Sequence, residues 1–423
     1  MANSFSKEER VAFEDILEGF NDALVLSRNV SVYRTDGTMM ERTNNIIWRP
    51  QPYIAQSYNG MDQTLNFTEF TQLAVPATLG FQKSVPWIMD ALELRDALQE
   101  GRLGDAAKQK LASDVNLAIM NVAANLGSLV VRTTGSAGSY DDVAACDTIM
   151  NEQGVQQFDR YLALSSRDYN GMAGNLAVAT RSFGNQISDE AYRRGFVGTV
   201  AGFQTYKFDY ANRIRQATGA DPTIDTRAAA GNYWVPVATS VAATGESANV
   251  DNRFQTVTVN STATLLAGDA ITIDGVVAVH HITKQSTGEL KTFRVVQVLT
   301  GTTCVITPPI ISAQGGTDAE LQYQNCIVTP AAAATVDRLN VDAAPINCFW
   351  QKDALEILPG RYAVPADAGA AVMRASTDQG IELVMQKQYD VNTMKTKYRL
   401  DCLFGVVNKQ PEMSGILLFG QTP

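Results

Sequence analysis

The sequence predicts an α+β protein into which an all-β unit is inserted. An apolar stripe over residues 104–126 indicates one long helix, and residues 223–345 alternate like a series of short strands. Segments of mixed helix and strand character lie on both sides of that β-rich stretch. With 423 residues and roughly 150 residues per domain as a guide, the chain is long enough for two or three domains.

Residues 6–27 predict an amphipathic helix. Apolar residues fall on one face at helical spacing: Phe13, Ile16, Leu17, Phe20 and Leu24. Ser6 followed by Glu9 fits a capping box at the start of this helix. Acidic residues fall away from the apolar face: Glu14, Asp15, Glu18 and Asp22. They form either the solvated side of a surface helix, which is the simpler interpretation, or an acidic strip for a basic partner.

Residues 104–126 give the strongest helix pattern. One stripe contains Leu111, Val115, Ala118, Ile119, Val122 and Leu126. Asp105 lies in the expected first turn, where a carboxylate suits the helix dipole, and Gly127 is a suitable C-cap. Such a helix is roughly 30 Å or more long and suggests a structural axis. The preceding segment, Trp87–Leu98, is expected to form a shorter helix.

Residues 35–75 predict an extended, two-stranded excursion. Pro50 and Pro52 exclude a helix interior there, and residues 58–61 (Tyr-Asn-Gly-Met) read as a turn. A long hairpin with no core of its own is marginal in water unless something packs on it. We therefore expect this segment to depend on a neighbour.

The β-rich stretch predicts a small all-β barrel or sandwich. Its expected strands are residues 254–259, 269–276, 293–298 and 304–306. Two turns are expected, at Asp274-Gly275 and at Thr300-Gly301. Outside it we expect helix starts at Asp141 and Ser188, and strands at residues 381–385 and 402–407.

Composition and charge exclude several functional classes. The 34 basic and 44 acidic residues give a net charge of −10, which disfavours sequence-independent nucleic-acid binding and attachment to a membrane surface through basic patches. No apolar stretch approaches the ~20 residues of a membrane helix. The start of the chain has no apolar signal core, so we expect a cytoplasmic protein.

Candidate chemistry is sparse. The five cysteines are widely spaced without a CxxC pair, which predicts free, buried thiols: Cys146, Cys304, Cys326, Cys348 and Cys402. His280 and His281 are adjacent, would point to opposite faces of a strand, and have no ligand-spaced partner. Asp141-Asp142 is explained by helix capping. We therefore expect no metal, no cofactor and no catalytic residues, and a chain that contacts copies of itself.

Short segments in a specific order carry a family resemblance. They include residues 45–50 (Asn-Ile-Ile-Trp-Arg-Pro), 125–130 (Asn-Leu-Gly-Ser-Leu-Val), 250–258 (Val-Asp-Asn-Arg-Phe-Gln-Thr-Val-Thr), 268–269, 271–273, 347–350 (Asn-Cys-Phe-Trp) and 420–422 (Gly-Gln-Thr). In order and spacing the chain resembles the major capsid (coat) proteins of P-twenty-two-like short-tailed double-stranded DNA phages, which have the HK97-like fold.

The resemblance implies a layout for the whole chain. Its parts would be an N-arm (1–34), an E-loop region (35–80), a P-domain with the spine helix (81–127), an A-domain (128–222), an inserted telokin-like I-domain barrel (223–345) and a return to the P- and A-domains (346–423).

The same resemblance implies a function without enzymatic activity. Copies would form hexamers and pentamers of an icosahedral shell, assembled in the host cytoplasm with a scaffolding protein as a procapsid. The shell would mature around double-stranded DNA packaged through a portal protein, without sequence-specific binding, and the protein would end in the virion. The net charge of −10 is consistent with a shell that must not bind its packaged DNA tightly.

Two sites are carried over from the family. Glu14 and Asp15, with Glu18 one turn on, match the acidic position that receives a basic scaffolding-protein helix. The loop before Val250 matches an acidic loop that reaches a neighbouring capsomer, but residues 244–247 contain only Glu246. An exposed ion pair there would contribute roughly 0–1 kcal/mol, so an ordinary loop residue is an equally good interpretation.

Three alternatives remain at this point. A cellular nanocompartment (encapsulin-like) shell protein would share the fold but enclose an enzyme, and the inserted barrel favours the phage interpretation. A surface adhesin would need a secretion signal. A hydrolase would have to rely on carboxylates such as Asp141 and Asp142.

Overall fold

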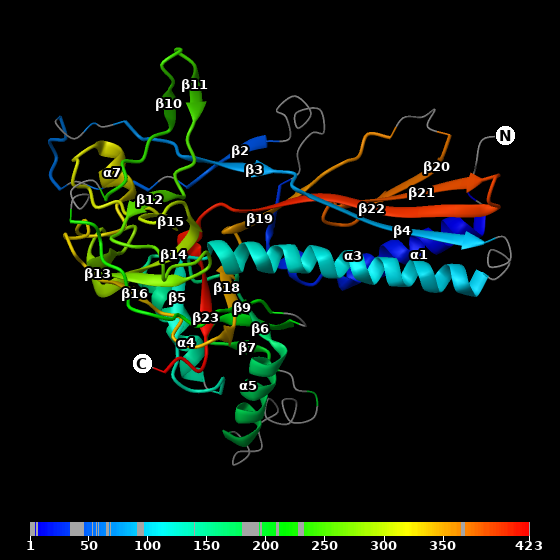
Figure 1. Cartoon of the computed structure of the whole chain (residues 1–423), viewed down its shortest axis with the longest axis horizontal. Helices are drawn as coiled ribbons and strands as arrows, with labels where there is room; N and C mark the ends of the chain where they lie inside the picture. The colour runs from blue at the N-terminus through cyan, green and yellow to red at the C-terminus, as the bar shows by residue number, and fades with distance from the viewer. Residues whose placement is uncertain are drawn as a thin grey trace. The chain divides into compact units, whose positions relative to one another are not determined.

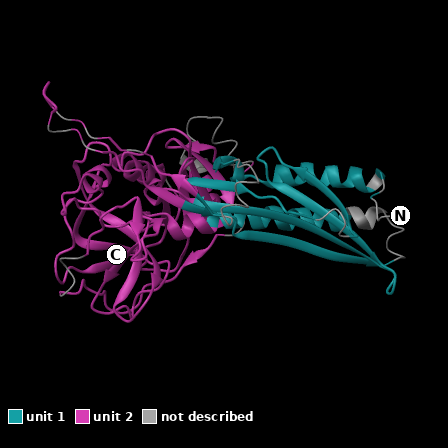
Figure 2. Ribbon diagram, turned by 90° about the horizontal axis from the view of Figure 1, so that it is seen from above, with its two compact units in different colours: residues 1–47, 76–120, 355–407 teal, residues 48–75, 121–354, 408–423 magenta. Residues whose placement is uncertain are grey.

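The computed structural model describes the chain except residues 1–4, 6, 34–45, 53, 56, 58, 65–66, 68, 91–96, 139, 180–193, 195–196, 209–210, 227–231, 365–368 and 423. It divides into two compact units, coloured separately in Figure 2. Unit 1 contains residues 1–47, 76–120 and 355–407, and unit 2 contains residues 48–75, 121–354 and 408–423. No helix among the described residues is long and apolar enough to span a bilayer.

Unit 1 is built on a mixed sheet. Its strands pair in the order β1 (Ser31–Val32), β19 (Leu355–Pro359), β22 (Lys395–Asn408), β21 (Glu382–Asp390) and β20 (Ala371–Ser376), and β4 (Phe81–Asp90) also pairs with β22. The strands expected at residues 381–385 and 402–407 are thereby confirmed within β21 and β22.

The helix expected over Trp87–Leu98 is wrong at its start, because Trp87 lies in strand β4. The burial of β4 alternates along the strand, and Trp87 is opposite Tyr398 of β22 with the two rings stacked 5.6 Å apart. Pairing with a strand from the other end of the chain therefore outweighs the local pattern. Residues 91–96 lie outside the described residues.

Helix α1 (Lys7–Ala23) confirms the first predicted helix, and a 3-10 turn η1 (Leu26–Asn29) follows it. The predicted stripe is buried at Phe13, Ile16, Phe20 and Leu24, whereas Leu17 is half-buried. The side chain of Asn116 donates a hydrogen bond to the carbonyl of Ala23 (3.1 Å) and so satisfies an orphan acceptor at the end of α1.

Helix α3 (Ala97–Leu126) begins earlier than the predicted residue 104 (Figure 1). Asp105 is thus inside the helix and not in its first turn, where it forms an ion pair with Lys108 at 2.7 Å. Gly104 was expected near the start, but a Cβ there would approach Cδ1 of Ile16 to 2.6 Å. This glycine is a contact surface for α1 and not a helix boundary.

Unit 2 contains a mixed sheet, called here the host sheet. Its order is β5 (Leu129–Arg132), β23 (Ser414–Leu418), β18 (Asn347–Gln351), β6 (Arg160–Ser165), β8 (Phe203–Phe208) and β7 (Thr199–Val200). Helices α4 (Tyr140–Glu152) and α5 (Ser166–Ala179) pack on it through one apolar cluster that includes Met150, Leu164 and Phe349. The helix start expected at Asp141 is confirmed, and the one at Ser188 lies outside the described residues.

The inserted β unit is also present in unit 2. Its strands pair antiparallel in the order β12 (Gln255–Thr258), β15 (Thr303–Thr307), β14 (Ser286–Val298), β13 (Ala270–Val279) and β16 (Val336–Arg338). A short helix, α7 (Asp318–Tyr323), belongs to the same stretch. All four predicted strands form around one core, and the α+β fold class with an inserted β unit is confirmed.

The turn predicted at Asp274-Gly275 is wrong. Strand β13 continues through both residues, and its register with β14 shifts between Thr272 and Val277. Gly275 has φ +77°, so it accommodates an irregularity inside the strand instead of reversing the chain. The turn at Thr300-Gly301 is confirmed, because the hydroxyl of Thr300 accepts the backbone N–H of Thr303 (3.1 Å).

Three short pairings complete the fold. The excursion predicted over residues 35–75 contains a two-stranded pairing of β2 (Ile46–Pro50) with β3 (Ala74–Thr78). The hairpin of β10 (Thr239–Val241) and β11 (Ser247–Asn249) and the pair of β9 (Arg213–Ile214) with β17 (Ala344–Pro345) belong to unit 2.

Gly415 in β23 allows the closest approach inside the host sheet. A Cβ there would lie 2.3 Å from the carbonyl oxygen of Leu129 and 2.5 Å from Cζ of Phe349. The carbonyl of Leu129 belongs to strand β5 and cannot move without disturbing the paired backbone, so no larger residue fits.

Gly415→Ala should lower the free energy of unfolding by about 1–3 kcal/mol or more, the usual effect of overpacking a core. The measurement is denaturant unfolding of the full-length chain. Gly301→Ala is the control, because nothing lies within 4 Å of its Cβ position. Equal stability of the two variants would contradict the role assigned to Gly415.

Candidate functional site

The acidic strip of α1 lies on the solvent side of the helix. Glu14, Asp15 and Glu18 are exposed, opposite the buried apolar stripe. Within the part of the chain that the structure describes, no salt bridge involves these three carboxylates. The strip therefore presents three charges that a basic partner can reach.

Glu9, one of the two residues of the expected capping box, is buried. Its carboxylate forms an ion pair with Lys387 and accepts a hydrogen bond from the hydroxyl of Tyr398 at 3.1 Å. These contacts join α1 to strands β21 and β22 in unit 1. Ser6 lies outside the described residues.

Glu246 lies at the tip of the β10–β11 hairpin, which extends away from the sheets of unit 2 in Figure 1. Every residue of both strands is exposed, and Glu246 is exposed as well. Gly245, at φ +87°, makes the tight turn. Glu246 is accessible to another molecule, but no described side chain forms a hydrogen bond or an ion pair with its carboxylate.

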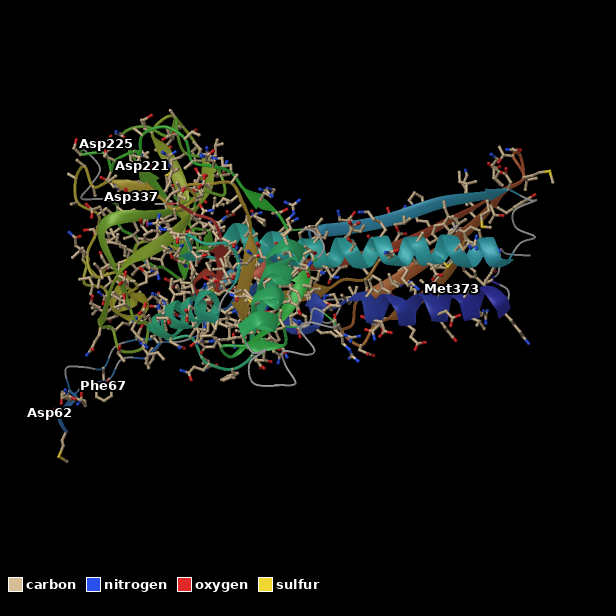
Figure 3. All side chains as sticks on the ribbon, turned by 90° about the horizontal axis from the view of Figure 1, so that it is seen from below. Asp62, Phe67, Asp221, Asp225, Asp337 and Met373 are labelled. Carbon is tan, nitrogen blue, oxygen red and sulfur yellow. The ribbon has the colours of Figure 1, made fainter. Side chains whose placement is uncertain are left out.

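The segment between β2 and β3 exposes large apolar side chains. Met61 is 104 % exposed, Phe67 87 % and Phe70 61 %, and Phe67 is labelled in Figure 3. Three large apolar side chains exposed within one short segment make this segment a candidate interaction surface.

The residues considered for chemistry in the sequence are explained by local structure. Nδ1 of His280 accepts the backbone N–H groups of Ile282 and Thr283, both at 3.2 Å, whereas His281 is buried. Asp141 and Asp142 lie in the first turn of α4. No group of three or more His, Cys, Asp or Glu residues suited to a metal occurs among the described residues.

All five cysteines are free and buried, as predicted. Burial raises the pKa of Cys304 to about 11 and, as the main cause, that of Cys402 to about 12. Such thiols are poor nucleophiles.

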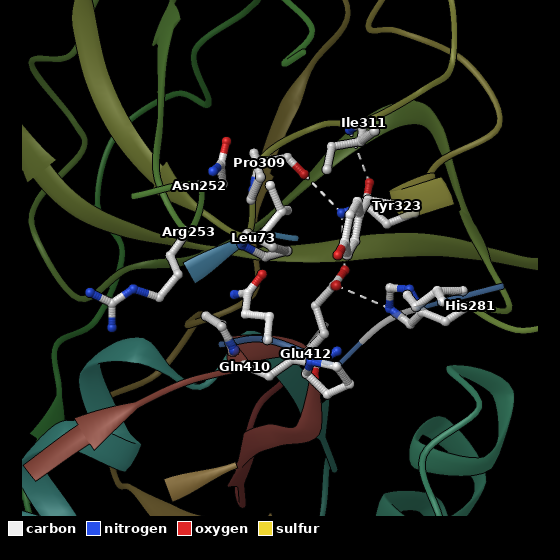
Figure 4. Close-up of a pocket in the computed structure, with 15 residues that line it drawn as sticks. Leu73, Asn252, Arg253, His281, Pro309, Ile311, Tyr323, Gln410 and Glu412 are labelled. Atoms are coloured by element: carbon white, nitrogen blue, oxygen red, sulfur yellow. Dashed lines mark hydrogen bonds and ion pairs between the residues drawn. The ribbon is translucent and has the colours of Figure 1, made fainter. Parts of the chain in front are cut away.

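A buried ionic cluster, which sequence reasoning missed, surrounds Glu412 in the turn η4 (Pro411–Met413). Its Oε1 lies 2.6 Å from Nζ of Lys291, and its Oε2 lies 3.0 Å from Nε2 of His281. The contact between Glu412 and His281 is marked in Figure 4. Lys291 also donates to Oε1 of Gln153 (2.7 Å), at the end of α4, and Asn325 donates to Glu412 (3.0 Å). We call Glu412, Lys291, His281, Gln153 and Asn325 the Glu412 cluster.

Burial and the neighbouring charges together shift two pKa values at this cluster. Burial alone would raise the pKa of Glu412, but the charges of His281 and Lys291 and the hydrogen bonds they donate hold it well below its usual range. Burial lowers the pKa of Lys284 to about 8, with Glu412 opposing and Lys291 assisting that shift. Glu412 therefore stays ionised because cations surround it.

The Glu412 cluster borders a small cavity of about 40 Å³, drawn in Figure 4. Three parts of unit 2 line it: Gln51, Pro52, Ile54 and Leu73 between β2 and β3, the inserted β unit, and the turn at residues 410–412. The volume is enough for a water molecule, because about 10–15 Å³ suffices for one.

A larger cleft of about 810 Å³ lies among α4, β5 and the inserted β unit. Its carboxylates disfavour anionic ligands. Burial and then the charge of Glu289 raise the pKa of Glu152, and burial followed by Asp221 and Asp274 raises that of Asp337. The lining has four carboxylates (Glu152, Asp221, Glu289 and Asp337) against two arginines (Arg132 and Arg338), and this acidic excess disfavours a phosphate backbone.

Comparison with known proteins decides the family. The sequence model of the family described as "P22 coat protein - gene protein 5" matches residues 1–420. The chain belongs to this phage coat protein family. The coat protein is thus a major capsid protein that forms the shell of a phage particle from many copies of itself, and the resemblance stated from the sequence is confirmed.

Solved structures similar to this coat protein include three phage proteins. The chain is 10% identical to a protein of Mycobacterium phage Che8 (94% of this chain, 91% of that chain, TM-score 0.43). It is 12% identical to the mature capsid protein of bacteriophage PhiM1 (100% and 89%, TM-score 0.43). It is 36% identical to the CUS-3 coat protein I-domain (28% and 90%, TM-score 0.20). The family assignment rests on the family match and not on these similarities.

Glu412 should make the coat protein sensitive to acid. Because its pKa is lower in the folded than in the unfolded chain, its stabilising effect is present above about pH 4.5 and declines as the pH falls further. Glu412→Gln should reduce the free energy of unfolding by about 3–5 kcal/mol at pH 7, since it leaves a buried cation without its partner. The difference in the free energy of unfolding between the variant and the wild type should shrink from pH 5 to pH 2. Denaturant unfolding at each pH measures it. A difference that stays constant over this range would show that the carboxylate charge is not the stabilising element.

Proposed function

We propose that this coat protein assembles in the host cytoplasm, together with a scaffolding protein, into an icosahedral procapsid of hexamers and pentamers. The procapsid then matures around double-stranded DNA that enters through a portal protein. The observation that carries the proposal is the family match over residues 1–420. The role is structural, and no residue is assigned to catalysis.

The exposed apolar residues between β2 and β3 support shell assembly. Met61, Phe67 and Phe70 would be removed from water by a neighbouring copy. Obligate interfaces of this kind are large and apolar, and weak contacts repeated around a closed particle add up to a stable shell. We propose this segment as part of the E-loop region, residues 35–80.

We propose the acidic strip of α1 as the scaffold-binding site. Glu14, Asp15 and Glu18 are exposed on one side of a helix that is fixed on its other side by buried apolar residues. A basic helix of the scaffolding protein fits this arrangement through charge complementarity. Because these charges are exposed to solvent, we expect them to steer and orient the scaffolding helix more than they strengthen its binding.

Glu246 is proposed only as a weak contact between capsomers. It is a single exposed charge at the tip of the β10–β11 hairpin. A surface ion pair there would contribute about 0–1 kcal/mol. The exposed hairpin itself, more than this charge, supports contact with a neighbour.

The charge distribution suits an enclosure for DNA. The chain carries a net charge of −10, and the large cleft of unit 2 contains carboxylates with raised pKa values. Tight binding of packaged DNA would need clustered Lys and Arg. The shell should therefore hold DNA by closure and not by affinity.

Expression of the chain with its scaffolding protein should give closed particles of uniform diameter in electron micrographs. Particles from infected cells should contain double-stranded DNA, whereas an enzyme as cargo would indicate a nanocompartment. A compact monomer that persists at high concentration with scaffolding protein present would contradict the proposed function.

Asp15→Lys should reduce the ratio of scaffolding protein to coat protein in purified procapsids by roughly two- to fivefold, since an exposed ion pair contributes at most about 1 kcal/mol. The ratio is measured by quantitative gel electrophoresis of the particles. Asp274→Lys is the matched control, because Asp274 is an exposed aspartate of the inserted β unit. An unchanged ratio for Asp15→Lys, or an equal fall in both variants, would count against the strip.

A further inference from the structure

Polar contacts hold the base of the segment between β2 and β3 against the inserted β unit. Gln51, Pro52 and Ile54, together with residues 71–73, are called here the arm base. The backbone N–H of Thr71 donates to Oε1 of Gln322 (3.1 Å). In return, the carbonyl of Thr71 accepts from Nε2 of Gln322 (3.3 Å) and from the hydroxyl of Tyr323 (2.9 Å). Both partners belong to α7.

The residues that follow α7 connect it to the Glu412 cluster. Asn325 donates through Nδ2 to the carbonyl of Pro309 (2.9 Å) and to Oε1 of Glu412 (3.0 Å). Lys284 donates to the carbonyls of Gln322 (2.8 Å) and Gln324 (3.1 Å). The segment from α7 to Asn325 is thus bonded at several points and cannot shift without breaking buried hydrogen bonds.

The other side of the Glu412 cluster is bonded to the host sheet and its helices. Lys291 bridges Glu412 and Gln153, the latter at the end of α4. Next to it, the hydroxyl of Thr292 donates to the carbonyl of Ser128, and the hydroxyl of Ser128 donates to the carbonyl of Pro411. Contacts therefore run without interruption from the arm base to α4.

We propose that the Glu412 cluster is a latch that couples the arm base to the C-terminal turn at residues 410–412 and to α4, so that the arm base is released when the cluster opens. A buried carboxylate and a buried ammonium are stable only when both are fully bonded, and a partly opened cluster is worse than a closed one. This gives the latch two discrete states. The titratable groups that face Glu412 are His281, Lys291, Lys284 and Cys326.

Hydrogen exchange of the full-length chain tests the latch, with the amides of Thr71 and Gln51 as readout. Both are bonded at the arm base, Thr71 to Gln322 and Gln51 to the carbonyl of Leu73 (2.9 Å). The variants are Glu412→Gln, Lys291→Met and the double substitution. Amides of β18 and β23 report global opening of unit 2 and serve as the internal reference.

Each single variant should accelerate exchange of the two arm-base amides by about tenfold relative to the β18 and β23 amides. The double variant should exchange less than the product of the single effects predicts, because it removes both members of the Lys291–Glu412 ion pair together. Glu382→Gln is the control: Glu382 is a buried carboxylate of unit 1, 4.0 Å from Arg374, and its removal should leave the arm-base amides unchanged.

Two results would overturn the latch. One is acceleration of the arm-base amides that only equals that of β18 and β23, which would mean general destabilisation. The other is loosening confined to residues near His281 and Lys291 with the arm base unaffected.

If Glu412→Gln does not fold, Gln153→Ala replaces it, because this change removes one neutral acceptor from Lys291 and leaves the ion pair. It should accelerate exchange at Thr71 by about threefold relative to β18 and β23. No acceleration at Thr71 in this variant would also refute the coupling.

Discussion

The arrangement of unit 2 depends on the compensation of one buried carboxylate. Glu412 is contributed by the turn before the last strand, and its partners come from the inserted β unit. A charge removed from water is tolerated only with complete compensation. The inserted β unit and the turn η4 are therefore joined by contacts that must all be made together if Glu412 is to be fully bonded.

Local sequence pattern predicted the elements whose stability is local or whose faces differ in polarity. The stripe with Phe13 and Phe20 located α1, and the alternation around Val257 and Val295 located the inserted β unit. The exposure of Glu14, Asp15 and Glu18 follows from the same periodicity, so this candidate site could be found from the sequence.

Long-range contacts set the limit of such prediction. Trp87 lies in a strand because it stacks on Tyr398, and Gly104 lies inside a helix because Ile16 packs against it. The Glu412 cluster unites Gln153, Lys291 and Glu412 from three separate regions, and none of them carries a local signal. Asp274-Gly275 misled for a related reason, since the same dipeptide suits an irregular strand as well as a turn.

The position of β23 in the host sheet constrains biosynthesis. This strand, residues 414–418, lies between β5 and β18, so these two strands, which are made earlier, join one sheet only when it arrives. Until residues 414–418 have emerged from the ribosome, the host sheet remains split and its edges are open to other chains. Completion of the host sheet therefore waits for β23, and chaperones would have a natural window to act before that strand arrives.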